Sequence, residues 1–158
     1  MKRLLTLAVL AVVMAGCKST SATGTKLDND MERKLNGSWT LTKVTNPGSD
    51  YIQVNSFQLA DSKCFEGSQW KFVDNNNKGE MSLPGGGNCP SFSSPITWFI
   101  NKEGQFVLKV LNAGEKAKRV RDGYVMTVAN ATGSSFELID QVNIGGSSGS
   151  VRYYFQKN

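Results

Sequence analysis

From Gly37 to the end of the chain, apolar and polar residues alternate with a period of two, and turns rich in Gly, Asn and Ser interrupt the alternation. This period places successive side chains on opposite faces of a β-strand. A chain of about eight strands must protect its edges, and closure into a barrel removes them. We therefore predict an all-β fold, an eight-stranded antiparallel up-and-down barrel with a short N-terminal helix; a two-sheet sandwich is the alternative. The predicted strands are 39–44, 70–73, 79–83, 96–100, 105–110, 124–129, 136–142 and 151–155.

A short helix is expected directly before the first strand. Leu27, Met31 and Leu35 recur every four residues, which places them on one face of a helix. The pair Asn36-Gly37 then ends this pattern, because Gly is a common residue just past a helix end.

The segment Gly37-Ser38-Trp39, directly behind this helix, resembles the Gly-x-Trp signature of lipocalins. The resemblance implies that the Trp packs across the closed end of an eight-stranded barrel, where lipocalins commonly place an Arg from the last strand against it. Here Lys157 is the best candidate for that position, because it shares the alternating face of Tyr153 and Phe155. Gly37, Trp39 and Lys157 are therefore the expected residues of barrel closure.

Residues 35–39, together with the later Trp70-Lys71-Phe72, also resemble small lipocalin-like lipoproteins of Bacteroidetes. The N-terminus agrees with that resemblance. A basic start, an apolar run over 4–14 and Met14-Ala15-Gly16-Cys17 are similar to a bacterial lipoprotein signal, with Met14 where Leu is usual. This similarity implies cleavage before Cys17 and acyl chains such as palmitate on that residue; an ordinary secreted protein is the alternative.

The chain is therefore expected to have three parts: a signal peptide over residues 1–16, a lipidated Cys with a flexible tether over 17–30, and a lipocalin-like domain over 31–158. Lys18 supplies no acidic retention signal, so the expected location is the outer membrane, with either face open. The acyl chains would be the only membrane attachment, because the apolar run is shorter than the roughly 20 residues that span a bilayer.

Two cysteines remain besides Cys17. An even pair in an exported protein predicts a disulfide between Cys64 and Cys89, closing a loop of about 25 residues; two free thiols are the alternative. Connections in an up-and-down barrel alternate between its ends, so the connections 45–68 and 84–95 should both lie at the open end. The disulfide would then join a long, lid-like loop to the rim of the barrel.

The same long loop is expected to contain a short helix capped by Asn55 or Ser56. A third connection at the open end, residues 112–123, carries four basic side chains, which either form a solvated loop or attract an acidic group.

The barrel interior is predicted from one alternating face of the strands. A barrel of eight strands either fills with side chains or holds one small ligand, and the sequence leaves both open. If a small hydrophobic or amphipathic ligand binds, its contacts are expected on the lid, in the wall and, for an acidic head group, at the mouth. The predicted inward residues are Leu41, Phe72, Trp98, Phe106, Leu108, Met126, Val128, Leu138, Tyr153 and Phe155, and the predicted ligand contacts are Tyr51, Phe57, Trp98, Tyr153, Lys43, Arg119 and Arg121.

Composition argues against several other functions. The chain has no His, so a Ser-His-Asp triad, a Cys-His pair and a His-ligated zinc site are excluded, and no enzyme activity or cofactor is expected. Without Lys2 and Arg3 of the expected signal, the formal net charge of +5 falls to +3, which is too mild to indicate a nucleic-acid partner. The expected state is a monomer, and the alternative function is a filled barrel that binds or inhibits another envelope protein.

Overall fold

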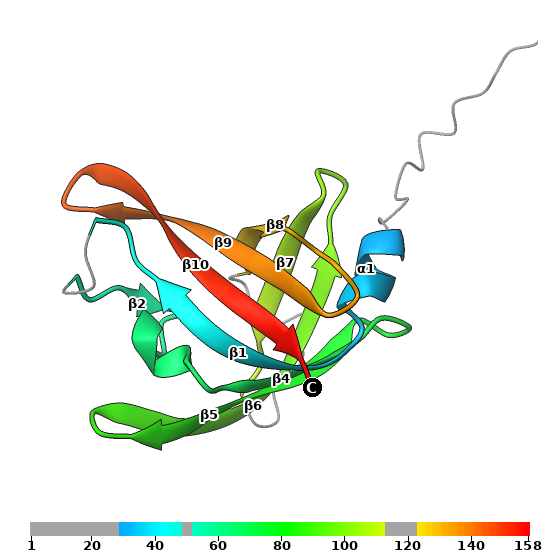
Figure 1. Cartoon of the computed structure of the whole chain (residues 1–158), viewed down its shortest axis with the longest axis horizontal. Helices are drawn as coiled ribbons and strands as arrows, with labels where there is room; N and C mark the ends of the chain where they lie inside the picture. Colours follow the sequence, from blue (N-terminus) through cyan, green and yellow to red (C-terminus); the bar gives the residue numbers. More distant parts are fainter. Residues whose placement is uncertain (1–28, 49–51, 113–122) are drawn as a thin grey trace, which may run out of the picture.

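The computed structural model describes residues 29–48, 52–112 and 123–158, and in it the predicted strands close into one barrel (Figure 1). Each barrel strand is antiparallel to the next one along the chain, and the last pairs with the first. This is the predicted up-and-down barrel, and a two-sheet sandwich is excluded. The elements are helix α1 (Asn29–Leu35) and strands β1 (Gly37–Thr45), β4 (Gln69–Val73), β5 (Lys78–Gly86), β6 (Cys89–Ile100), β7 (Gln105–Val110), β8 (Tyr124–Ala129), β9 (Ser135–Ile144) and β10 (Ser147–Lys157).

Several boundaries differ from the sequence prediction. We expected residues 84–95 to form a loop, and this expectation was wrong. Strands β5 and β6 pair as far as Gly86 and Cys89, so that only a tight hairpin turn joins them. Interstrand pairing tolerates the polar, Gly- and Pro-containing residues there, which local propensity assigns to a loop.

The two ends of the barrel differ (Figure 1). Helix α1 lies at one end, whereas the loop that contains β2 (Asn55–Ser56) and the tips of the β5–β6 and β9–β10 hairpins lie at the other. We call these the closed end and the mouth. The connection between β1 and β4 therefore lies at the mouth, as expected from the alternation of connections.

A register shift in β1 changes which side chains face inward. Trp39 and Leu41 pair with Lys157 and Phe155, but a bulge between Leu41 and Lys43 follows. The bulge adds one residue to the strand, so the alternation resumes one position later. Val44 is consequently buried and Lys43 lies exposed on the outer face of the barrel.

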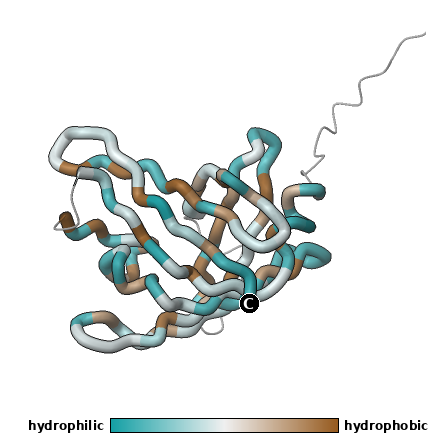
Figure 2. Tube along the Cα trace, viewed as in Figure 1, coloured by the Kyte–Doolittle hydropathy of each residue, from teal (hydrophilic) through white to brown (hydrophobic). Residues whose placement is uncertain are grey.

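The barrel interior contains a continuous column of aromatic rings. Trp39 at the closed end contacts Phe136 edge-on, with 4.7 Å between the ring centres, and Phe136 stacks on Phe155 with 4.5 Å between the ring centres. Phe155 contacts Trp70 at 5.7 Å, and Trp70 contacts Phe57 of the mouth loop at 6.2 Å. Figure 2 shows the matching alternation of hydrophobic and hydrophilic residues along the strands. Such edge-on and offset pairs add to the free energy gained from burial, which makes this column a main support of the fold.

The inward face was largely predicted from the alternation. Of the ten residues predicted to face inward, nine are at most 2% exposed, and the tenth, Val128, is partly buried against the core.

At the closed end, Gly37 and Trp39 occupy the positions that the resemblance implied. The Trp39 indole is fully buried and its N–H donates to the carbonyl of Leu35 at 2.8 Å, which joins β1 to the end of α1. The ammonium of Lys157 lies 5.3 Å from the centre of the indole ring. Gly37 has a φ of +133° and its Cα lies so close to this pair that an added Cβ would lie 3.0 Å from Cε of Lys157. Only Gly adopts that backbone conformation readily, which explains the residue types of the motif.

Helix α1 is held against the closed end by Glu32. Its side chain is 4% exposed and accepts hydrogen bonds from the backbone N–H of Ile100 at 2.9 Å and from the amide of Asn77 at 3.2 Å. The carboxylate thus satisfies a buried backbone donor at the end of β6, which an apolar side chain would leave unpaired.

Candidate functional site

The loop between β1 and β4 covers the mouth of the barrel. It contains a small hairpin of β2 (Asn55–Ser56) and β3 (Ala60–Asp61), followed by the 3-10 helix η1 (Ser62–Phe65). A disulfide joins Cys64 in η1 to Cys89 at the start of β6, with 5.3 Å between their Cα atoms. The predicted disulfide is therefore confirmed, and it ties the loop to the rim.

The short helix in this loop was expected at the wrong place. Asn55 and Ser56 form β2 instead of a cap, and the N-cap of η1 is Asp61. One carboxylate oxygen of Asp61 accepts from the backbone N–H of Lys63 at 2.9 Å, and the other accepts from that of Val54 at 3.1 Å. Asp is as good a cap as Asn or Ser, so local sequence did not separate the candidates.

Phe57 lies at the tip of the hairpin and inserts its ring into the mouth. Its side chain is 5% exposed, and its ring lies 5.1 Å from Phe65, 5.1 Å from Tyr124, 5.5 Å from Tyr153 and 6.2 Å from Trp70. We call the four rings around Phe57 the aromatic socket. A side chain carried by the loop, instead of one from the barrel wall, thus occupies the top of the interior.

The backbone at this tip is strained. Phe57 and Gln58 both have positive φ values, 54° and 55°. Left-handed conformations are unfavourable for residues other than Gly, and above all for bulky ones, so the surrounding contacts must impose them. Packing of the Phe57 ring in the aromatic socket supplies those contacts.

A buried hydrogen bond joins the hairpin to the barrel wall. The hydroxyls of Ser56 and Tyr153 lie 2.6 Å apart, and both residues are at most 2% exposed. Burial raises the pKa of the Tyr153 hydroxyl well above its ordinary range, so that it stays protonated and is available as a donor. Tyr153 was predicted as a ligand contact and does line the mouth.

Asp140 of β9 also faces the interior at the mouth. It pairs across the sheet with the fully buried Val151, and Leu138 and Phe136 precede it on the same face. The pKa of its carboxyl is raised above the ordinary value because burial disfavours the charged form. Sequence reasoning missed this residue, although the alternation through Phe136 and Leu138 places it inward.

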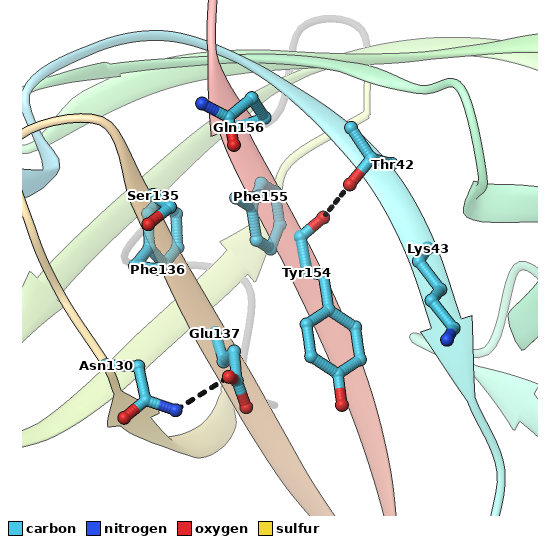
Figure 3. Close-up of a pocket in the computed structure, with 9 residues that line it drawn as sticks. All are labelled: Thr42, Lys43, Asn130, Ser135, Phe136, Glu137, Tyr154, Phe155 and Gln156. Carbon is cyan, nitrogen blue, oxygen red and sulfur yellow. Dashed lines mark hydrogen bonds between the residues drawn. The ribbon is translucent and has the colours of Figure 1, made fainter.

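The other predicted ligand contacts are dispersed. Trp98 lies in the closed half, where it stacks on Phe106 at 5.7 Å and its indole N–H donates to the carbonyl of Lys78 at 3.0 Å. The Lys43 ammonium lies 6.0 Å from the ring centre of Tyr154 on the outer face, away from the interior (Figure 3). The predictions for Tyr51, Arg119, Arg121 and Cys17 lie outside the described residues.

Two pockets with walls made of described residues lie on the outer face of the barrel. One, of about 300 Å³, runs over β1, β9 and β10 beside Lys43 and Tyr154, as Figure 3 shows. The other, of about 280 Å³, lies over β4 and β5 beside Lys71 and Glu80. Trp70 of the aromatic socket is among the residues that line the second pocket, whereas the lining of the first includes no socket residue.

The described part of the chain lacks two other kinds of site. Within residues 29–48, 52–112 and 123–158, no three His, Cys, Asp or Glu side chains gather in a way that would hold a metal ion. The helices in these ranges include none that is long and apolar enough to span a bilayer.

Comparison with known proteins identifies the domain. The family described as Lipocalin-like domain matches residues 35–138. No curated protein matches the chain significantly. Among solved structures, a bovine odorant-binding protein in complex with a selenium-containing odorant is 12% identical, with a TM-score of 0.47 over 80% of this chain and 72% of that one. Lobster apocrustacyanin A1 is 7% identical, with a TM-score of 0.42 over 85% of this chain and 71% of that one. At these scores the likeness is one of fold alone.

Proposed function

This chain belongs to the lipocalin-like domain family, and we propose that it is a lipid-anchored binding protein that takes one small hydrophobic or amphipathic molecule into the mouth of its barrel. The observation that carries the proposal is the position of Phe57. Its ring fills an aromatic socket, yet the residue belongs to a hairpin whose strands are two residues each. A ligand with an apolar ring can replace the Phe57 ring if the hairpin moves.

The free-energy changes of this exchange favour a binding site that opens and closes. Withdrawal of Phe57 relieves the strain of two left-handed residues and breaks the hydrogen bond between Ser56 and Tyr153. An incoming apolar molecule restores the ring contacts, and buried apolar area contributes about 25 cal/mol per Å². The disulfide at Cys64 holds the loop beyond the hairpin, so that only residues 52–61 need to move.

The socket is tested by Phe57→Gly, which removes the ring and the strain at φ 54° together. We expect the purified variant to bind the neutral fluorescent probe N-phenyl-1-naphthylamine at least about tenfold more tightly than the native chain, because the competing ring is gone. Phe92→Ala is the matched control, since this Phe packs against the core from β6 outside the socket. Equal affinities of the native chain and Phe57→Gly would contradict the proposal.

The natural ligand is sought by solvent extraction of protein purified from its own cell envelope, followed by mass spectrometry. A single class of molecule extracted from the native chain in stoichiometric amount supports the proposal. Its absence, together with no gain of probe binding in Phe57→Gly, removes it.

The anchor is a separate part of the proposal and rests on the resemblance of residues 1–17 to a lipoprotein signal. Acyl chains on Cys17 would hold the domain at the outer membrane as a monomer, without enzymatic activity. Each buried methylene contributes about 0.8 kcal/mol, so two or more chains give stable attachment. Cys17→Ser should abolish incorporation of labelled palmitate; labelled variant protein would contradict the anchor but not the binding site.

One observation favours a second function. The interior rings are tightly packed, and the pockets described above lie outside the barrel. A filled barrel would act through its outer surface or its mouth loops by binding or inhibiting another envelope protein. Affinity capture from membranes with the native chain and a variant shortened in the β5–β6 hairpin tests this. Capture that needs the hairpin, combined with unchanged probe binding in Phe57→Gly, would favour this function over ligand binding.

A further inference from the structure

Asp140 is distinguished from the other residues that face the interior. On the described strands, the inward positions carry apolar, aromatic or small polar side chains, with two charged exceptions. Lys157 is one, and it covers Trp39 at the closed end. Asp140 is the other, and it is half-buried at the mouth.

The position of Asp140 relative to the aromatic socket follows from the strand register. Tyr153, a member of the socket, pairs with Leu138, and Asp140 follows Leu138 on the same face, one inward step nearer the mouth. One inward step is two residues, or roughly 6.7 Å along a strand. The carboxylate of Asp140 is close enough to the Tyr153 hydroxyl to raise the pKa of that group. A short carbon chain would therefore be long enough to join an apolar ring in the place of Phe57 to a group at this carboxylate.

None of the ion pairs between described residues includes Asp140. The described ion pairs join other carboxylates: Arg33 with Asp30 in α1, Arg152 with Glu137 on the outer face, and Lys63 with Glu66 in the loop. The ammonium of Lys63 also donates to the carbonyl of Val44. On the described strands, Asp140 is therefore the charged side chain that faces the interior at the mouth.

This charge differs from one part of the expectation from sequence. An acidic head group was expected to meet Lys43, Arg119 or Arg121, of which the two arginines lie outside the described residues. The bulge in β1 places Lys43 on the outer face, whereas Asp140 faces inward. The rings of the socket also favour a cationic ligand, because an aromatic face attracts a cation.

We propose that the ligand is a small cationic amphiphile, in which an aromatic ring takes the place of Phe57 and a protonated amine, two or three carbons away, binds the carboxylate of Asp140. This inference rests on the proposed function and specifies the chemistry of the same site. The amine would donate to Asp140, whose half-buried carboxylate is accessible from the mouth. The Tyr153 hydroxyl would lie beside the link between ring and amine.

The test compares three probes of matched size that differ in charge: 2-phenylethylamine, 2-phenylethanol and 3-phenylpropanoate. Binding is measured by titration calorimetry at pH 7 with the full-length native chain and with Phe57→Gly, Asp140→Asn and Glu103→Gln. Glu103→Gln is the control, because this carboxylate is exposed in the β6–β7 turn. We expect the amine to bind about tenfold more tightly than the alcohol, and the acid to bind most weakly, since a hydrogen bond between charged groups supplies that factor.

Asp140→Asn should remove the preference for the amine and leave the affinity for the alcohol within about twofold. Equal binding of all three probes, or a preference for the acid, would overturn the cationic ligand while leaving ring binding in the socket intact. Failure of all three to bind both the native chain and Phe57→Gly would overturn the proposed function with it. The comparison among probes needs only the native chain, so it decides between these outcomes even if Asp140→Asn folds poorly.

Discussion

At the scale of single residues, the buried tryptophans and Asp140 contrast in how well their polar groups are satisfied. The indole N–H groups of Trp39, Trp70 and Trp98 all donate hydrogen bonds, to the carbonyl of Leu35, the hydroxyl of Ser68 and the carbonyl of Lys78. For Asp140 at the mouth, burial instead disfavours the charged form of the carboxyl and raises its pKa. Satisfied groups stabilise the fold, whereas a desolvated charge in an opening is typical of a binding site.

Gly37→Ala is expected to destabilise the protein by about 2 kcal/mol, because a residue with a Cβ is strained at a φ of +133°. The contact with Lys157 contributes less, since the end of that side chain can move. Gly133→Ala is the control: its φ is not in the left-handed range and an added Cβ would meet nothing within 4 Å. Urea denaturation followed by tryptophan fluorescence measures the difference. Equal loss in the two variants would contradict the role given to Gly37.

Asp140→Asn is expected to stabilise the folded chain at neutral pH. Because burial raises the pKa of Asp140 in the folded state above its unfolded value of 3.8, the folded state binds the proton more tightly. The native chain therefore loses stability relative to the variant as pH rises from the unfolded pKa through the raised folded pKa. The titratable group that faces Asp140 from the neighbouring strand is the Tyr153 hydroxyl, which stays protonated and uncharged.

We expect the melting temperature of Asp140→Asn to exceed that of the native chain by about 2–4 °C at pH 7 and to equal it near pH 3. Differential scanning calorimetry across this range measures the effect, with Glu103→Gln as the exposed control. A variant that melts below the native chain at pH 7 would show that the carboxylate stabilises the fold instead. Stability gained together with amine binding lost would identify Asp140 as a functional residue that the fold tolerates.

At the scale of elements, helix α1 is attached to the barrel by two polar links as well as by packing. The carbonyl of Leu35 accepts from Trp39, and the carboxylate of Glu32 accepts from the backbone N–H of Ile100. A helix of seven residues is too short to be stable by itself, so these contacts determine whether it forms.

Glu32→Ala is expected to reduce the free energy of unfolding by about 2 kcal/mol, because it leaves the N–H of Ile100 buried without a partner. Glu32→Gln keeps an acceptor oxygen and should lose less than half of that amount. Hydrogen exchange at the Ile100 amide is the specific readout, and it should accelerate in the Ala variant alone. Unchanged protection of that amide in Glu32→Ala would refute the link.

At the scale of the whole molecule, the barrel needs no edge protection, because β1 pairs with both β4 and β10. The disulfide adds one covalent link between the mouth loop and the wall. It joins two segments that the hydrogen-bond ladder of the barrel does not connect.

Replacing both Cys64 and Cys89 with Ser is expected to lower the free energy of unfolding by about 3.5 kcal/mol, the chain-entropy value for a separation of 25 residues. Reduction of the native chain should give the same loss, as measured by denaturation in urea with and without reductant. Because the hairpin with Phe57 precedes Cys64, probe binding in the socket should be retained below the unfolding transition. A loss under about 1 kcal/mol would show that the loop is already ordered without the bond.

Local pattern was enough for much of this protein. The period of two placed the strands and nine buried inward residues, and the even pair of cysteines predicted the disulfide. The resemblance of Gly37-Ser38-Trp39 to a lipocalin signature implied the closed end. These features depend on neighbours in the chain or on simple counting, which is why one sequence sufficed. The fold class followed, because a meander of this length avoids exposed edges by closing.

Only the tertiary structure decided the contents of the mouth. Phe57 enters the socket because rings from β4, β8, β10 and η1 converge there, a contact between segments far apart in sequence. A single bulge in β1 turned Lys43 outward, and register across β9 and β10 turned Asp140 inward. Alternation determines which residues share a face, but a one-residue shift or a long-range contact determines which face is inside, and with it the charge that a ligand would meet.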